Sequence, residues 1–156
     1  GAVGEDWDAW AALFTADARY VEHVLGNLEG REAIRNWIKP IMEQYGEIYT
    51  AYEWHSVDVE AGRVMVYMQN RRDHPSGSGV IDFPGITILD YAGDGRWKQE
   101  EDFWAVPAAS RATEEYEAAR KQFDRDHRRK MTRREWGHGP EWTRGGPTFA
   151  ARRPWR

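Results

Sequence analysis

The hydrophobic period of this chain changes near Tyr49, and that change restricts the possible folds more than any other feature. Within residues 31–44 the apolar side chains recur at helical spacing. From Tyr49 onward they alternate, and turn residues separate four segments that we predict as strands: 49–59, 63–72, 80–91 and 96–104. Helices followed by strands joined through short turns indicate an α+β fold with a mainly antiparallel sheet.

The segments outside this run predict the remaining elements. We expect a short helix at 6–15, a strand at 18–24 and a long surface helix at 108–130. Gly26 and Gly30 are expected to bracket a loop, and Pro40 to kink or break the helix at 31–44. The expected architecture is a curved sheet wrapped around the N-terminal helices.

Composition limits the class of protein. A chain of 156 residues is long enough for one domain that encloses a core or a pocket. The chain contains no cysteine, which excludes disulfides and thiolate chemistry. No apolar run reaches the ~20 residues of a membrane span, and no signal peptide is visible, so we expect a cytoplasmic protein without a membrane partner. The chain begins at Gly1, so a trimmed N-terminus stays open.

Charge divides the chain at residue 128. Residues 128–156 hold nine Lys and Arg against two Glu, a net +7, which leaves −11 on residues 1–127. We predict a domain at 1–127 and a basic, aromatic arm at 128–156. We expect the arm to dock on the acidic domain, or on a partner subunit, and to close the pocket mouth. Nucleic-acid binding is disfavoured because the acidic domain repels a polyanion, and an arm without fixed structure is the remaining alternative.

The strand at 96–104 carries carboxylates between aromatic residues. Strict alternation puts Glu100, Asp102 and Trp104 on one face, and Trp97, Glu101 and other residues on the opposite face. Burial of either face also buries an acidic side chain. Burial among aromatic rings raises the pKa of a carboxyl group toward the range useful for acid–base catalysis. The alternative is that these acids are solvated or paired, Asp102 for example with Arg71 or Arg72.

Three sequence pieces carry a family resemblance: Leu13-Phe14-Thr15-Ala16-Asp17-Ala18-Arg19-Tyr20, Gly30-Arg31-Glu32-Ala33-Ile34, and Gly93-Asp94-Gly95-Arg96-Trp97 with the acidic strand after it. Over residues 5–120 the chain resembles the nuclear transport factor 2-like superfamily, in particular its SnoaL-like branch. The resemblance implies a cone-shaped α+β barrel with one deep pocket, commonly a homodimer, and no metal or redox cofactor. Members include polyketide cyclases, limonene epoxide hydrolase, scytalone dehydratase and ketosteroid isomerase.

The resemblance also implies site residues. Asp102 matches the acid–base aspartate of SnoaL-like polyketide cyclases, and Tyr20 matches a pocket tyrosine of limonene epoxide hydrolase. Three positions differ from that hydrolase: this chain has Glu22 in place of a water-positioning asparagine, Asn70 in place of an aspartate and Met68 in place of an arginine. These departures disfavour epoxide hydrolysis.

Five residues are therefore catalytic candidates. Asp102 is expected to move the proton, while Tyr20 and Asn70 polarise the substrate oxygen. Glu22 shares a strand face with Tyr20 and is expected to share a proton network with Asp102. The alternative is that Tyr20 belongs to the core and Glu22 caps the pocket rim against an arginine. His55 is a candidate general base or a hydrogen-bonded wall residue. No metal is expected, because His23 has the opposite strand parity to Glu22 and no His-x-His spacing exists.

Large apolar side chains complete the predicted pocket. Those expected to bind substrate are Trp7, Trp10, Phe14, Trp37, Met42, Trp54, Met68, Ile86 and Trp104. The predicted function is a cofactor-independent cyclase, dehydratase or isomerase that acts by acid–base catalysis on a hydrophobic carbonyl, polycyclic or terpenoid compound. The alternatives are a non-catalytic ligand-binding or protein-docking domain and, third, water addition of the epoxide hydrolase type.

Overall fold

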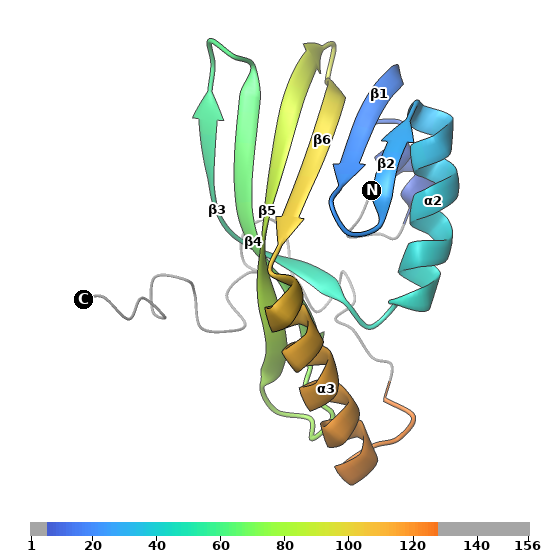
Figure 1. Cartoon of the computed structure of the whole chain (residues 1–156), viewed down its shortest axis with the longest axis vertical. Helices are drawn as coiled ribbons and strands as arrows, with labels where there is room; N and C mark the ends of the chain where they lie inside the picture. Colours follow the sequence, from blue (N-terminus) through green and yellow to red (C-terminus); the bar gives the residue numbers. More distant parts are fainter. Residues whose placement is uncertain (1–5, 128–156) are drawn as a thin grey trace, which may run out of the picture.

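The computed structural model describes residues 6–127, which form three helices and six strands (Figure 1). Their order is α1 (Trp7–Ala11), β1 (Phe14–Glu22), β2 (Gly26–Glu29), α2 (Arg31–Gln44), β3 (Tyr49–Asp58), β4 (Arg63–Asp73), β5 (Val80–Gly93), β6 (Arg96–Trp104) and α3 (Val106–Gln122). The predicted α+β class is confirmed. The predicted arm at 128–156 lies outside the described residues.

The six strands form one curved sheet that does not close, in the order β2-β1-β6-β5-β4-β3 (Figure 1). Strands β3 to β6 follow one another antiparallel, as their short connections require. Strand β1, in contrast, pairs with β6 in parallel. The first and the last strand of the chain therefore lie side by side in the middle of the sheet.

Two boundaries near the N-terminus differ from the predictions. The helix expected at 6–15 ends at Ala11, and the strand expected at 18–24 already begins at Phe14. The cause is pairing with β6, since the Trp97 amide donates to the Leu13 carbonyl at 2.8 Å. The loop expected after Gly26 is instead strand β2, which pairs antiparallel with β1 and places Leu28 opposite Tyr20.

The helices also refine the predictions. Helix α2 continues through Pro40, and its amphipathic pattern buries Ile34 and Ile38. Helix α3 begins at Val106, with Pro107 in the first turn, where its missing N–H costs no hydrogen bond, and ends at Gln122 rather than at 130. No helix within residues 6–127 is long and apolar enough to cross a membrane.

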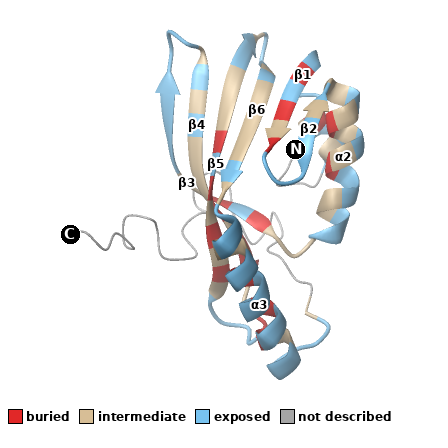
Figure 2. Ribbon diagram, in the orientation of Figure 1, coloured by how far each residue is buried: buried red, intermediate tan, exposed pale blue. Residues whose placement is uncertain are grey.

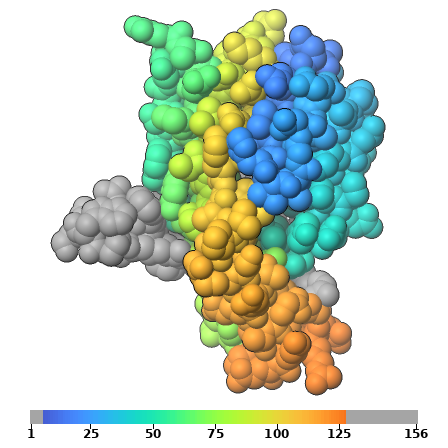
Figure 3. Space-filling model, in the orientation of Figure 1, coloured from blue at the N-terminus to red at the C-terminus, as the bar shows by residue number. Residues whose placement is uncertain are grey.

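The buried apolar residues form two clusters on the sheet (Figure 2). One joins β1 to α2 through Phe14, Ala18, Tyr20 and Ile34. The other joins the first half of β5 to α3 and contains Ile81, Phe83, Ala112, Tyr116 and Ala119. The blue-to-teal surface of β1, β2 and α2 and the orange surface of α3 occupy different parts of the sheet (Figure 3). This arrangement leaves a stretch of sheet between the two clusters.

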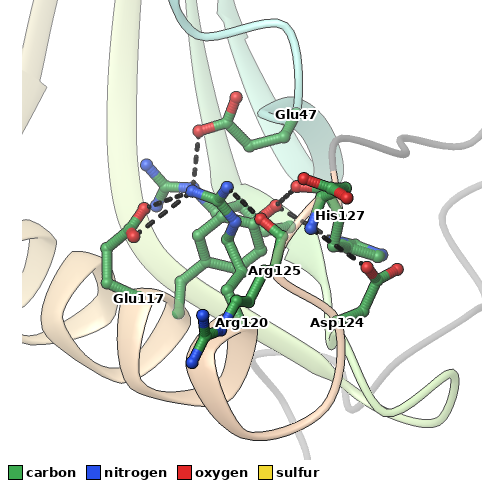
Figure 4. Close-up of polar contacts among 9 residues, drawn as sticks. Glu47, Glu117, Arg120, Asp124, Arg125 and His127 are labelled. Carbon is green, nitrogen blue, oxygen red and sulfur yellow. Dashed lines mark hydrogen bonds and ion pairs between the residues drawn. The ribbon is translucent and has the colours of Figure 1, made fainter.

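Polar contacts fix the end of α3 and the residues after it (Figure 4). Arg120 donates to Glu117 at 2.9 Å and to the Arg125 carbonyl at 2.5 Å. The Tyr116 hydroxyl donates to the His127 carbonyl at 3.0 Å. The chain is therefore held against α3 up to the last described residue.

Candidate active site

A cavity of about 540 Å³ opens between the sheet and helices α1 and α2. This volume suits a drug-sized small molecule. The structure brings into its wall all the residues predicted to bind substrate except Trp54: Trp7, Trp10, Phe14, Trp37, Met42, Met68, Ile86 and Trp104. Four of the five predicted catalytic residues also line it: Tyr20, Glu22, Asn70 and Asp102.

Strands β1 and β6 supply the acidic part of the wall. In their parallel register Tyr20 lies opposite Glu100, and Glu22 lies opposite Asp102. The four side chains face the cavity. Three carboxyl groups from two neighbouring strands are therefore held beside one another.

Asp102 is fixed by two hydroxyl groups. The Tyr20 hydroxyl donates to Oδ2, and the Thr87 hydroxyl of β5 donates to Oδ1 at 2.5 Å. Tyr20 has a single proton, so in this arrangement the proton is directed at Asp102 and not at a substrate oxygen. The Tyr20 hydroxyl thus holds the Asp102 carboxyl in place, and the oxygen-polarising role expected from the sequence stays a prediction.

Glu22 is almost fully buried, with 3% of its surface exposed, and it accepts three hydrogen bonds. The Trp104 indole donates to Oε1 at 2.5 Å, and the amides of Val24 and Leu25 donate to Oε2 at 3.0 and 2.5 Å. These contacts tie the β1–β2 turn to the end of β6. Glu22 therefore shapes one side of the wall as well as adding its charge.

Glu100 is the site residue that sequence reasoning missed. It lies two residues before Asp102 on the same face of β6 and lines the cavity. The alternation itself contained the signal, because it placed both acids on one face. The family resemblance, which decides between the two acids, points to Asp102 alone.

The environment of the cavity wall raises the pKa values of three groups, Glu100, Asp102 and Tyr20. Burial, and then the charge of Asp102, raise the pKa of Glu100 well above its usual value, although Tyr20 opposes the shift. Burial also raises the pKa of Asp102 against the hydrogen bonds from Thr87 and Tyr20. Burial and the nearby acids raise the pKa of the Tyr20 hydroxyl, which therefore stays protonated. Glu100 and Asp102 therefore retain protons at a pH where exposed carboxyls have lost them.

These acids have no cationic neighbour in the described part of the cavity wall. Among the described residues, no Lys, Arg or His lines the cavity. The two arginines considered as partners of Asp102 pair elsewhere, Arg71 with Asp82 at 2.9 Å and Arg72 with Glu47 at 3.4 Å. Asp102 is therefore not solvated at the surface, and no arginine within residues 6–127 neutralises it.

Asn70 presents an amide to the same cavity from β4. It lies opposite Thr50 on β3 and Phe83 on β5. A Cβ atom added at Gly85 would come within 3.1 Å of the Asn70 Nδ2 atom, so the glycine leaves room for this side chain. Asn70 is thus a neutral donor that the wall holds without a charge.

Irregular pairing at two points explains where the alternation misplaced side chains. Between β3 and β4, one extra residue at Glu53 puts Trp54 opposite Tyr67, and their rings stack with centroids 5.5 Å apart, outside the cavity. His55 is exposed and does not line the cavity, but its Nδ1 atom lies 2.7 Å from the hydroxyl of the wall residue Tyr52.

The second irregularity lies at Lys98, where two residues of β6 oppose one of β5. It brings Trp97, expected on the opposite face, into the wall with Glu100. Alternation therefore holds from Gln99 onward, which is the part of the strand that carries the acids.

Within residues 6–127, no group of three or more His, Cys, Asp and Glu side chains is arranged to hold a metal ion. Glu22, Glu100 and Asp102 share a wall, but they do not converge on one point as metal ligands do. The site chemistry open to them is proton transfer and the binding of an organic compound.

Comparison with known proteins identifies the family. The model of the SnoaL-like domain matches residues 3–100, so the chain belongs to the SnoaL-like family, and the predicted superfamily is confirmed. Among curated proteins, none matches this sequence.

Solved structures of low sequence identity share the fold. An LEH-like epoxide hydrolase from M. tuberculosis is 16% identical, with a TM-score of 0.60 over 76% of this chain and 84% of its own. A protein with a ketosteroid isomerase-like fold from Catenulispora acidiphila, in complex with trimethylamine, is 20% identical, with a TM-score of 0.56 over 68% and 80%. A provisionally named SnoaL-like polyketide cyclase from Jannaschia sp. CCS1 is 22% identical, with a TM-score of 0.54 over 70% and 81%.

Proposed function

We propose that this protein is a cofactor-independent enzyme that moves a proton on a hydrophobic carbonyl compound, as an isomerase, dehydratase or cyclase does. One observation carries the proposal. Asp102 lies in the wall of an aromatic cavity, held by two hydroxyl groups and with no cationic side chain of residues 6–127 beside it. A carboxyl whose pKa is raised in this way works as a base near neutral pH.

The proposed reaction begins at the carbon next to the carbonyl group. The Asp102 carboxylate takes a proton from this carbon, and the electron pair moves to the carbonyl oxygen. The Asn70 amide donates to that oxygen and stabilises its growing charge. Return of the proton from Asp102 to another carbon completes an isomerisation. Loss of a β-hydroxyl group as water, with that proton given to the leaving oxygen, completes a dehydration. Attack of the carbon on a second carbonyl, with that proton given to the new alkoxide, completes a cyclisation.

The cavity supports catalysis over a purely structural role. Its own tryptophans do not fill it, and about 540 Å³ remains for a ligand. The trimethylamine complex of the Catenulispora protein supports small-molecule binding by this fold. Epoxide hydrolysis is a weaker candidate, because Met68 occupies the position where the resemblance expects an arginine, and no arginine within residues 6–127 lines the cavity.

The test measures proton transfer without requiring the natural product. Hydrophobic cyclic ketones are incubated with the protein in D₂O, and exchange at the carbon next to the carbonyl is followed by NMR. Asp102→Asn is expected to lower the exchange rate about 10²-fold or more while the melting temperature is unchanged. The matched control is Glu101→Gln, the neighbouring acid, which pairs with His23 at 2.8 Å. An Asn variant that exchanges at the wild-type rate contradicts the proposal.

We also propose that the protein is a homodimer formed through the sheet face opposite the cavity. Large apolar side chains outside the cavity remain exposed, among them Trp54 and Met65. Such a surface is typical of an interface rather than of a monomer. Native mass spectrometry of the full chain tests this, and a monomer at micromolar concentration contradicts it.

A further inference from the structure

The charge of the cavity wall carries information about the ligand that its shape does not. Three carboxyl groups, Glu22, Glu100 and Asp102, face the cavity, and no basic side chain within residues 6–127 lines it. Buried acids elsewhere in the described chain have arginine partners, as Glu47 has in Arg72 at 3.4 Å. A buried carboxylate without a cation is unfavourable, because it loses hydration and gains no opposite charge.

The rest of the wall is rich in aromatic rings. Trp10, Phe14 and Trp37 surround Tyr20, with ring centroids 5.1 to 6.3 Å from its own ring. Trp97 and Trp104 line the same cavity. Aromatic faces attract organic cations and bind their apolar substituents as well. The acids and the rings therefore favour the same kind of ligand.

We propose that the compound bound in this cavity carries an organic cation, a protonated or quaternary amine attached to an apolar carbonyl compound, and that this cation lies against the acidic wall formed by β1 and β6. This inference rests on the proposed function, since it specifies the charge of the substrate on which Asp102 acts. Because the three carboxyls do not form a metal-binding group, the wall fits a large, diffuse cation better than a small ion.

Binding of the cation replaces a proton. Without ligand, burial and the charge of Asp102 raise the pKa of Glu100, so this side chain keeps its proton to a higher pH than an exposed glutamate does. The titratable groups that face it are Tyr20, Glu22 and Asp102, and none of them supplies a positive charge. An arriving cation stabilises the ionised form of Glu100, whose proton leaves to solvent. Asp102 keeps its basicity, because the cation provides the positive charge that the proton provided before.

The experiment compares two probes of equal shape and different charge. Benzyltrimethylammonium has a fixed positive charge, and neopentylbenzene is its neutral isostere. Both are titrated into the full chain, with tryptophan fluorescence as the signal and calorimetry to count the protons released by the cation. At pH 8 we expect the cation to bind at least about tenfold more tightly than the isostere. We expect this preference to fall as the pH is lowered toward 5. Equal binding, or tighter binding of the neutral probe, overturns the inference.

A pair of variants locates the effect. Glu100→Gln is expected to reduce the preference for the cation about tenfold and to leave the affinity for neopentylbenzene within twofold of the wild type. Glu101→Gln, one residue further along β6, is expected to change neither affinity, since its carboxylate contacts His23 outside the cavity. An equal loss of cation binding in both variants overturns the proposed location.

The probe-binding experiment and the proton-transfer assay can fail independently, so the cation proposal and the enzyme proposal are tested separately. If Asp102→Asn abolishes exchange and the neutral probe binds more tightly, the enzyme proposal stands and the cation proposal fails. If the cation is preferred and Asp102→Asn still exchanges at the wild-type rate, the cavity is a cation-binding site and the proposed catalytic role fails.

Discussion

Two regions of this molecule bury acidic side chains, and they neutralise them differently. Near α3, Arg72 and Glu47 form an ion pair at 3.4 Å, and the guanidinium also lies over the Tyr116 ring. In the cavity wall, the side chains of residues 6–127 that donate to Asp102 are the neutral hydroxyls of Tyr20 and Thr87. A neighbouring fixed cation keeps a carboxylate ionised, so that it does not take part in proton transfer. Hydroxyl donors hold a carboxylate in place and leave it able to bind a proton. The Arg72–Glu47 pair is thus suited to stabilising the fold, and the acids of the cavity wall are suited to proton transfer.

Breaking the ion pair tests the structural half of this comparison and has the largest expected effect. Arg72→Met removes the guanidinium and leaves the Glu47 carboxylate without it in a mostly buried position. We expect the free energy of unfolding, measured by urea denaturation, to fall by about 3 to 5 kcal/mol. The double variant with Glu47→Gln is expected to recover part of this loss. A double variant as unstable as the single one would contradict the ion-pair explanation.

For the acidic wall we predict the opposite effect: removal of a carboxyl group raises stability, whereas removal of the Arg72 guanidinium lowers it. An acid whose pKa is raised in the folded state binds more protons there than in the unfolded chain, so stability is highest at low pH. It decreases as the pH rises from the ordinary carboxyl pKa through the raised one. Each unit of pKa shift corresponds to about 1.4 kcal/mol. We therefore expect Glu100→Gln to melt at a higher temperature than the wild type at pH 8.

The control for this prediction lies on the same strand. Glu101→Gln is expected to leave the pH dependence of the melting temperature unchanged, since its carboxylate lies on the other face beside His23. If Glu100→Gln lowers the melting temperature at pH 8, the wall does not carry the electrostatic cost that we assign to it.

Removing one hydroxyl group has the smallest expected effect and sharpens the role of Tyr20. Its hydrogen bond lowers the pKa of Asp102 against the effect of burial. Tyr20→Phe is thus expected to move the acidic limb of the pH–rate profile, where Asp102 loses its proton, to higher pH and to reduce the rate at neutral pH about tenfold. A pH–rate profile of exchange in D₂O measures both. A lower rate with an unchanged profile would assign Tyr20 to substrate contact instead.

Much of the fold followed from local sequence patterns. The period change near Tyr49 located strands β3 to β6, and strand β6 agrees with the prediction at both ends. The parallel pairing of β1 with β6 has no local signal, because it joins residues about 80 positions apart. It was also this pairing that ended α1 early and converted Phe14 into a strand residue.

The site was predictable as far as strict alternation held. Alternation with the family resemblance gave Asp102, Tyr20, Glu22 and Asn70, all of which line the cavity. Single extra residues at Glu53 and Lys98 reversed the pattern locally, and they account for Trp54 outside the wall and Trp97 inside it. Such insertions depend on how neighbouring strands twist, which no single strand's sequence reveals.

The parallel β1–β6 pair has a consequence for how the chain folds. The acids that it brings together come from the first and the last strand, so the complete acidic wall forms only when β1 pairs with β6. Contacts between such distant segments slow folding, because a long loop must close first. At alkaline pH this closing step also forces like charges together, so folding should be slower at pH 9 than at pH 6. The same acids that prepare the cavity for proton transfer then act as a late electrostatic barrier during folding.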